Sequence, residues 1–195
     1  MKDFSKIPDV QDEFTREWHS REEIPADRNG LERLIIEQHF SNFHLWHEED
    51  RARTPNAPAE RIAEVKRNID RLNQRRNDLI EEIDRALLES LKHIHAESAE
   101  LHSETPAMMI DRLSILSLKV YHTREEAERK DAGREHRVKN LDRLKILEDQ
   151  RGDLADNLQR LWNDLQAGRR RFKLYRQLKM YNDPALNPEI YRSKS

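Results

Sequence analysis

Four side chains that could do chemistry lie in the most apolar stretch of the chain, residues 104–122. They are Asp111, Arg112, Lys119 and His122, and most of their neighbours are Met, Ile, Leu or Val. An acid, two cations and an imidazole can bind an anion, hold a cation or transfer protons. An unpaired ion is costly inside a protein. These groups therefore pair with other helices, line a ligand site, or reach water along aliphatic stems at the edge of the apolar face.

Three predicted helices carry a polar residue where the apolar pattern indicates a core position. The three residues are Asp111, Arg76 and Arg151, and Glu49 or Asp50 lies beside the apolar stripe of a fourth helix. Helical bundles often build sites from such inward side chains. Two interpretations stay open. One is a buried salt-bridge layer that fixes the register of the helices, and the other is a ligand site with guanidinium groups for an anion and carboxylates for a metal or a base.

Long amphipathic helices must position these residues. Charged residues make up 38% of the 195 residues and only four are glycine, which is typical of solvated helices. Apolar residues recur at three- and four-residue spacing in four segments, which are about 31–53, 59–102, 106–130 and 135–180. We therefore predict an all-α fold: an elongated antiparallel bundle of about four long helices, with coiled-coil-like pairing, over residues 29–191.

The segments on either side of the bundle have different patterns. Residues 1–28 form an N-terminal arm, whose short helix we expect to pack on the bundle through Phe14 and Trp18. An exposed arm that binds a partner is the alternative. Turn-forming residues at 182–184 predict a C-terminal tail that folds back onto the bundle, and residues 192–195 are expected to be disordered.

Composition excludes several classes of function. The chain has no cysteine, which excludes disulfides, zinc–thiolate sites and thiol catalysis. Its 36 Lys and Arg and 38 Asp and Glu almost balance, so nucleic acid is not the expected partner. The basic segment 169–179 could contact phosphates, or it could end a helix with cations that favour the helix dipole. The chain begins without an apolar signal region and has no run long enough to span a membrane, which predicts a cytoplasmic protein.

Several motifs resemble a bacterial family, the domain of unknown function numbered 4254. They are Leu45-Trp46-His47 with Glu49-Asp50, Asp111-Arg112-Leu113-Ser114-Ile115-Leu116 with Lys119 and His122, Gln150-Arg151, and Met180-Tyr181-Asn182-Asp183-Pro184. The resemblance covers about residues 30 to 191. It implies that the polar motif residues are better site candidates than composition alone suggests. It also implies a link with bacterial gene clusters that contain glycosyltransferases.

We expect a polar site between helices that binds a phosphorylated or nucleotide-like small anion. The residues expected to bind this ligand are Arg112, Lys119, Arg151, Trp46 and Asn182. A divalent metal would be held by Glu49 and Asp50, and the groups that act as base or transfer protons would be Asp111, His47 and His122. The alternative is a non-enzymatic helical interaction protein, accessory to cell-surface glycan synthesis, in which the polar layer is structural. A homodimer is expected in either case.

Overall fold

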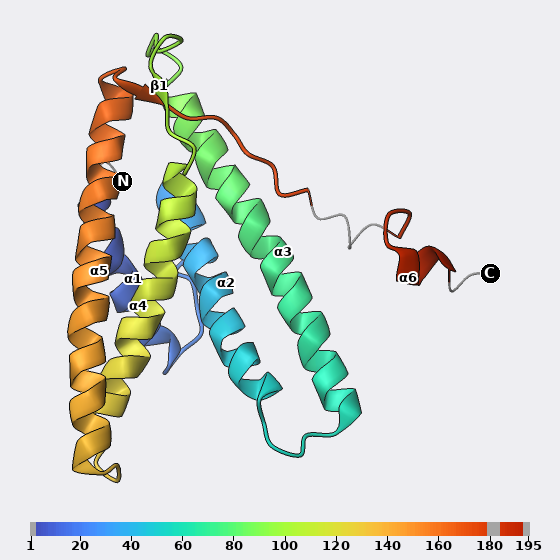
Figure 1. Ribbon diagram of the computed structural model, residues 1–195. Helices are drawn as coiled ribbons and strands as arrows, with labels where there is room; N and C mark the ends of the chain where they lie inside the picture. The colour runs from blue at the N-terminus through green and yellow to red at the C-terminus, as the bar shows by residue number, and fades with distance from the viewer. Residues whose placement is uncertain (1–2, 179–183, 193–195) are drawn as a thin grey trace.

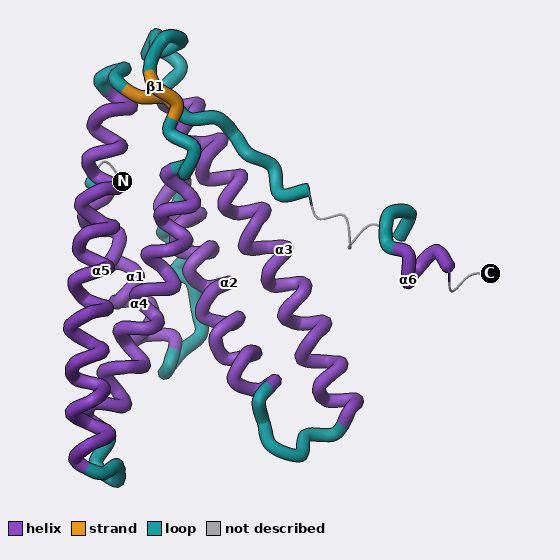
Figure 2. The backbone as a smooth tube through the Cα atoms, viewed as in Figure 1, coloured by secondary structure: helices purple, strands orange, loops and turns teal. Residues whose placement is uncertain are grey.

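The computed structural model describes residues 3–178 and 184–192 and is all-α, as predicted (Figures 1 and 2). Its longer helices are α1 (Ile7–Trp18), α2 (Gly30–Ala52), α3 (Ala59–Ser90), α4 (Pro106–Glu128) and α5 (Arg134–Gln166). Its short elements are the 3₁₀ helix η1 (Phe4–Lys6), the strands β1 (Glu100–Leu101) and β2 (Arg170–Arg171), and α6 (Pro188–Tyr191). No described helix has the length and apolar character needed to cross a membrane.

Two antiparallel helical hairpins form the body of the molecule. One consists of α2 and α3 and the other of α4 and α5, and α1 packs against α4. The hairpins lie close together near β1 and spread apart toward the turns that follow α2 and α4 (Figure 1). In this arrangement α4 is the central helix, because it contacts α1, α2, α3 and α5.

Two apolar clusters meet at α4. The larger one joins η1, α3, α4 and α5 around the fully buried Ile110 and Leu113. The second joins α1, α2 and α4 around Trp18, Phe43 and Leu118. Residues on different faces of α4 therefore enter different cores, which explains why apolar residues surround this helix rather than forming one stripe.

The start of α4 is held by caps from its own turn and from α3. Thr105 Oγ1 accepts a hydrogen bond from the N–H of Met108 at 3.3 Å, and Pro106 occupies the first turn. Asp84 Oδ1 accepts a hydrogen bond from the N–H of Ala107 at 3.0 Å. Burial raises the pKa of Asp84 to about 6. These caps confirm the predicted beginning of the helix.

The N-terminal arm is part of the core. Phe14 and Trp18 are buried, as predicted. Phe4 is also buried, its ring lies 4.8 Å from that of Trp162, and its N–H donates to Gln159 Oε1 at 2.7 Å. The arm thus packs against α5 as well as against α4.

Two predicted helices are too long. The predicted helix to residue 102 ends at Ser90 in α3, and the predicted helix to residue 180 ends at Gln166 in α5. Gly168 has φ +67°, and the N–H groups of Gly168 and Arg169 donate to the carbonyls of Leu165 and Asp164 at 3.1 and 2.9 Å. This pattern is a Schellman C-cap, which stops α5 whatever apolar residues follow.

Two short segments that were predicted to be helical, one after α3 and one after α5, pair with each other as strands. β1 and β2 are parallel, with Glu100 opposite Arg170 and Leu101 opposite Arg171. Arg171 also donates from Nε to the carbonyl of Ala99 at 2.9 Å. A short parallel pair therefore closes the end of the bundle where the hairpins meet.

The C-terminal tail returns to the bundle only in its first part. Phe172 is buried, and the N–H of Gln177 donates to Glu81 Oε1 of α3 at 2.9 Å. Leu186, in the tail that the sequence predicts to fold back onto the bundle, is 50% exposed, so this residue is not buried there. The predicted site residue Asn182 lies outside the described residues, as do residues 193–195 of the segment 192–195 that was predicted to be disordered. Arg192, the first residue of that segment, is described and follows α6 as its C-cap.

Candidate functional site

Asp111 lies in a buried polar layer between α2, α3 and α4. Its two carboxylate oxygens accept hydrogen bonds from Arg76, with 2.7 Å between Nε and Oδ1. Gln38 Nε2 and Asn42 Nδ2 donate to Asp111 Oδ1 at 2.5 and 3.0 Å. The hydrogen bond to Asp111 raises the pKa of Arg76. The inward polar residues of α3 and α4, Arg76 and Asp111, therefore satisfy each other's hydrogen-bonding groups.

The layer continues from Asn42 to a fully buried histidine. Asn42 Nδ2 donates to Ser114 Oγ at 2.9 Å, and Ser114 Oγ lies 2.7 Å from His39 Nδ1. His39 Nε2 lies 2.9 Å from the carbonyl oxygen of Gln11, so Nε2 carries the proton and Nδ1 accepts from Ser114. Burial lowers the pKa of His39 to about 3, and the ring is neutral.

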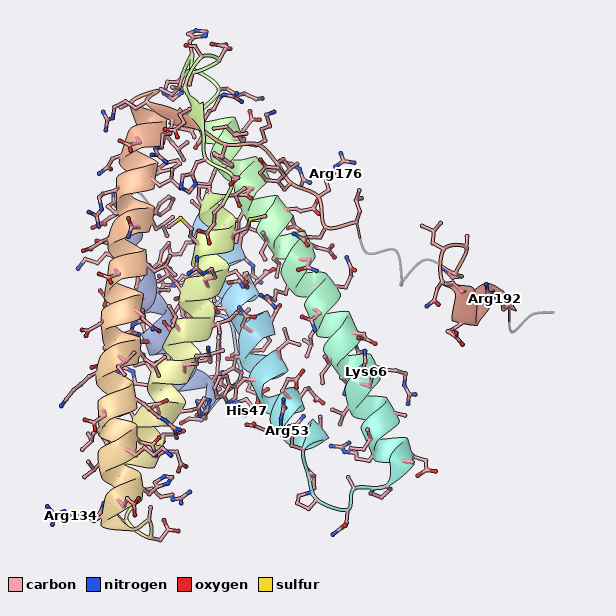
Figure 3. All side chains as sticks on the ribbon, viewed as in Figure 1. His47, Arg53, Lys66, Arg134, Arg176 and Arg192 are labelled. Atoms are coloured by element: carbon pink, nitrogen blue, oxygen red, sulfur yellow. The ribbon has the colours of Figure 1, made fainter. Side chains whose placement is uncertain are left out.

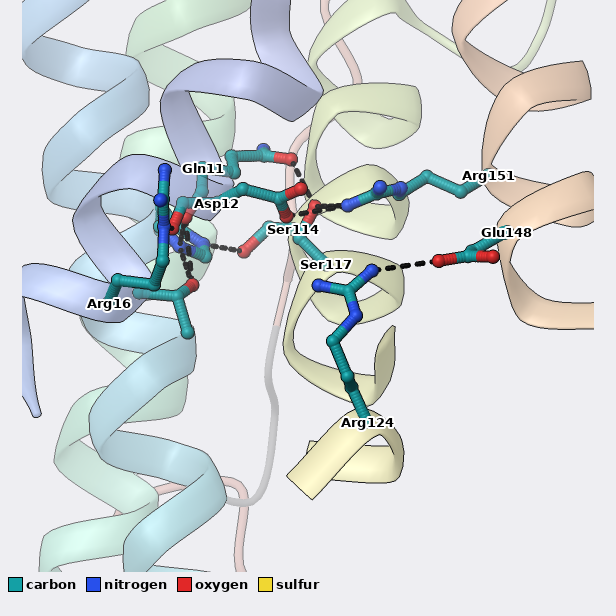
Figure 4. A network of polar contacts seen from close by, with 10 residues as sticks. Gln11, Asp12, Arg16, Ser114, Ser117, Arg124, Glu148 and Arg151 are labelled. Carbon is teal, nitrogen blue, oxygen red and sulfur yellow. Dashed lines mark hydrogen bonds and ion pairs between the residues drawn. The ribbon is translucent and has the colours of Figure 1, made fainter. Parts of the chain in front are cut away.

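Arg151 of α5 completes the layer on the other side of α4 (Figure 4). Its Nη1 donates to Asp12 Oδ1 of α1 at 2.5 Å and to Ser117 Oγ at 3.4 Å. Ser117 in turn donates to Gln11 Oε1 at 3.2 Å. Arg151 thus pairs with the arm helix and not with Asp111, and the network crosses the bundle from α3 to α5.

These contacts fit the structural interpretation of the inward polar groups. A buried ion pair with added hydrogen bonds is tolerated in a core and fixes how helices align. Asp111 accepts from three side chains, which leaves little of its hydrogen-bonding capacity for a substrate. The layer is therefore better suited to fixing the positions of α2, α3 and α4 than to binding a substrate.

A cluster of three histidines lies farther along α4. His19 follows α1, His47 is in α2 and His122 is in α4, and one ring nitrogen of each lies within 4.8 Å of the others. His47 is near the same end of α2 as Arg53 (Figure 3). His19 is exposed, whereas His47 and His122 are half-buried. We call these three residues the histidine cluster.

Each histidine of the cluster packs against an aromatic ring. Trp46 stacks on His122 with 4.8 Å between ring centroids and an interplanar angle of 10°. Tyr121 stacks on His19 at 4.5 Å, and Phe43 meets the edge of His47 at 4.6 Å. The imidazole rings are thus oriented by packing and not only by hydrogen bonds.

Burial favours the neutral form of the two half-buried members of the cluster. Burial lowers the pKa of His47, and the neighbouring His122 and His19 lower it further. Burial also lowers the pKa of His122, although its hydrogen bond to Glu125 acts in the opposite direction. The charge of Asp50 favours protonation of both rings less strongly than burial opposes it. Neutral imidazoles offer lone pairs to protons or metal ions.

A groove of about 920 Å³ runs between α4 and α5 on another face of α4. We call it the α4–α5 groove. Its floor includes the buried apolar side chains of Met109, Leu154 and Leu161. Its polar lining is mixed and consists of His102, Glu104, Arg112, Lys119, Gln150, Asp153, Asn157, Arg160, Asp164 and Arg170. This volume lies in the range of small-molecule sites, about 300–1,000 Å³.

A smaller hollow of about 350 Å³ lies between α2, α3 and α4. Trp46, Glu49 and Asp50 line it, and Arg76 of the polar layer lies at one side. Glu49 pairs with Arg53 at 2.8 Å, whereas Asp50 has no ion pair among the residues that the structure describes. The hollow therefore connects the polar layer with the residues around the histidine cluster.

The structure divides the predicted site residues among separate places. Trp46, His47 and His122 meet in or beside the histidine cluster, and Asp50 lies close to it. Arg112 and Lys119 line the α4–α5 groove, while Asp111 and Arg151 belong to the polar layer. The single site that the sequence predicts is thus divided among three separate places along and around α4.

Sequence reasoning missed His19. This residue lies at the end of the arm helix and has no helical spacing relation to His47 or His122. Its one sequence signal is its position directly after the buried Trp18, which places it at the edge of the core. Only the packing of α1 against α4 brings it to the other two rings.

One comparison with known proteins identifies a relationship. A protein-family model described as "Protein of unknown function (DUF4254)" matches residues 32–174. The searches of curated proteins and of solved structures found no match. The matched region includes α3 to α5, nearly all of α2, the groove and most of the polar layer, and it excludes His19 and the α1 residues Gln11 and Asp12 of the layer.

Proposed function

Because the chain belongs to the DUF4254 family of proteins of unknown function, we propose its function from its own geometry: it binds a phosphorylated or nucleotide-like small anion in the α4–α5 groove. The observation that carries this proposal is the set of cations around the groove. Arg112, Lys119, Arg160 and Arg170 all line it.

Two of these cations have no carboxylate partner. Lys119 and Arg160 form no ion pair within residues 3–178 and 184–192, and both are exposed. Arg112 is paired with Glu104 at 2.5 Å, and Arg170 lies 3.6 Å from Glu100. Lys119 and Arg160 are thus available for a phosphate, and the paired arginines can add hydrogen bonds at the rim.

The rest of the lining suits a ligand with an apolar or planar part. The buried side chains of Met109, Leu154 and Leu161 offer apolar contact at the floor. The amides of Gln150 and Asn157 offer hydrogen bonds to hydroxyl or base groups. A groove with an apolar floor and a few convergent polar groups is the usual form of a small-molecule site.

Calorimetry and thermal shift with nucleoside di- and triphosphates, sugar phosphates and pyrophosphate test this proposal. We expect at least one of these anions to raise the melting temperature of the wild type. Lys119→Ala and Arg160→Ala should each weaken its binding about tenfold, the effect of losing roughly 1.4 kcal/mol. Lys139→Ala, which removes an exposed cation of α5 outside the groove, is the matched control. If no anion stabilises the wild type, the proposal is wrong.

A second candidate function, as a helical interaction protein, has support from α5. Val138, Leu141 and Ile146 are 47%, 46% and 57% exposed near the start of this helix. Such residues can form a self-complementary helix pair in a homodimer. Sedimentation should then show a dimer for the wild type and a monomer for Leu141→Glu with Ile146→Glu. A monomeric wild type at high concentration would remove this candidate. A role in glycan synthesis and a place in the bacterial cytoplasm stay predictions from the sequence.

A further inference from the structure

The histidine cluster has the geometry of a metal site. Three imidazoles come from α1, α2 and α4, and one nitrogen of each lies within 4.8 Å of the others. A tetrahedral zinc site with Zn–N distances of about 2.0–2.1 Å places ligand nitrogens about 3.3 Å apart. Each nitrogen therefore needs to move by less than about 1 Å to reach a common ion, which small side-chain rotations allow.

Hydrogen bonds fix the tautomer of two of the rings. His19 Nδ1 lies 2.7 Å from the carbonyl oxygen of Thr15, and His122 Nδ1 lies 2.8 Å from Glu125 Oε2. Since both partners only accept, each Nδ1 carries the proton and each Nε2 has a free lone pair. Metal-binding histidines usually show this arrangement, in which a carbonyl or carboxylate holds the ring nitrogen that faces away from the metal.

His122 Nε2 is buried and has no hydrogen-bond partner among the described residues. A buried nitrogen left without a partner costs free energy. The Trp46 ring stacked on His122 prevents water from approaching that face of the imidazole. A ligand that accepts the Nε2 lone pair would remove this cost.

We propose that His19, His47 and His122 bind a divalent transition metal ion, with zinc as the best match. Three imidazoles without a thiolate suit zinc and its neighbours in the first transition row. Magnesium and calcium take oxygen ligands and do not fit. Because His19 is exposed, the site has a side open to water, and the charge of Asp50 acts on His47 from α2.

This metal site is separate from the proposed anion site. The histidine cluster involves α1 and α2, whereas the α4–α5 groove involves α5, and they have no lining residue in common. In this proposal the N-terminal arm has a role besides packing, since His19, directly after α1, supplies one ligand.

Calorimetric titration of the full chain without an affinity tag, using zinc chloride alone, tests the proposal. We expect one zinc ion per chain with micromolar or tighter affinity and no response to magnesium chloride. Cobalt(II) should give the intense visible absorption of a four-coordinate site with nitrogen ligands.

Four variants locate the site. His19→Asn, His47→Asn and His122→Asn should each weaken zinc binding more than about 100-fold, and Glu125→Gln, which affects a positioning residue, about 10–100-fold. The matched control is His93→Asn, an exposed histidine in the connection between α3 and α4, which should bind zinc like the wild type.

His19→Asn is the decisive variant, because its exposed side chain is removed without opening the core. Circular dichroism should show that this variant keeps the helical content of the wild type. Zinc binding that persists unchanged in His19→Asn, or a wild type that binds no zinc, overturns the proposal. A loss of binding in His93→Asn overturns it too, because it places the metal elsewhere. Loss of zinc binding with unchanged anion binding would leave the function of the α4–α5 groove intact.

Discussion

The polar layer around Asp111 and the histidine cluster around His122 lie about three turns apart on the same helix. Asp111 accepts hydrogen bonds from Arg76, Gln38 and Asn42. His122 uses Nδ1 for Glu125, and its buried Nε2 has no hydrogen-bond partner among the described residues. Both residues are polar groups in an apolar helix, yet Asp111 has its acceptor oxygens filled whereas His122 has a buried nitrogen left over. In the layer around Asp111, Gln38 Oε1 is the buried atom that has no partner among the described residues. Unused capacity, and not burial of a polar residue as such, marks the better candidate for a site.

Removing the carboxylate of the polar layer should have the largest effect. Asp111→Ala leaves the guanidinium of Arg76 half-buried without its counter-ion. We expect a loss of about 3–5 kcal/mol in the free energy of unfolding at pH 7, measured with urea. Asp156→Ala, at an exposed acid of α5, should change it by less than about 0.5 kcal/mol. A loss below about 1 kcal/mol for Asp111→Ala would contradict the structural role of the layer.

The neutral His39 should make stability depend on pH. The folded pKa is about 3 and the ordinary value is 6.5, so the unfolded chain binds the proton more tightly. The contribution of His39 is therefore fully present above about pH 6.5 and falls as pH drops toward 3. Between pH 7 and 4.5 the loss is about 2.5 kcal/mol.

His39→Gln isolates this effect from that of the other titrating groups. Glutamine is neutral throughout and can still donate to the carbonyl of Gln11, so the variant should lose less stability than the wild type over the same pH range. Denaturant unfolding of both proteins at several pH values measures the difference. Equal pH dependence in the two proteins would show that His39 is not held neutral.

A smaller effect is expected from the hydroxyl that joins the two halves of the layer. Ser114→Ala removes the donor to His39 Nδ1 and one acceptor for Asn42 Nδ2. Asn42 keeps its bond to Asp111, so mainly His39 loses a partner. We expect a loss of about 1–2 kcal/mol by urea unfolding. The control Ser98→Ala, at an exposed serine, should be neutral, and an equal loss there would argue against the network.

The histidine cluster should contribute least to stability when metal is removed. His47→Asn in the presence of a chelator should change the free energy of unfolding by less than about 1 kcal/mol, because its ring makes no hydrogen bond within the described residues. Urea unfolding of both proteins checks this. A loss as large as that of Asp111→Ala would show that the cluster, like the layer, mainly supports the fold.

Helix patterns predicted most of the bundle but not where two helices end. The arm helix and the beginning of α4 followed from local signals, namely the spacing of Phe14 and Trp18 and the Thr105-Pro106 cap. α5 ends at Gln166 because Gly168 adopts φ +67° and forms the Schellman cap with Leu165 and Asp164. The apolar spacing continues to Phe172, so periodicity alone predicted a longer helix.

The candidate sites divide in the same way. The residue types and helix faces were evident in the sequence: Arg112 and Lys119 share one face of α4, and Asp111 and His122 another. The packing of α1, α2 and α5 around α4 decided the partners of these residues. It determined which of them form ion pairs, which have none, and which lie beside His19. Periodicity determines the direction of a side chain within its own helix, and only tertiary packing determines which partner it meets there.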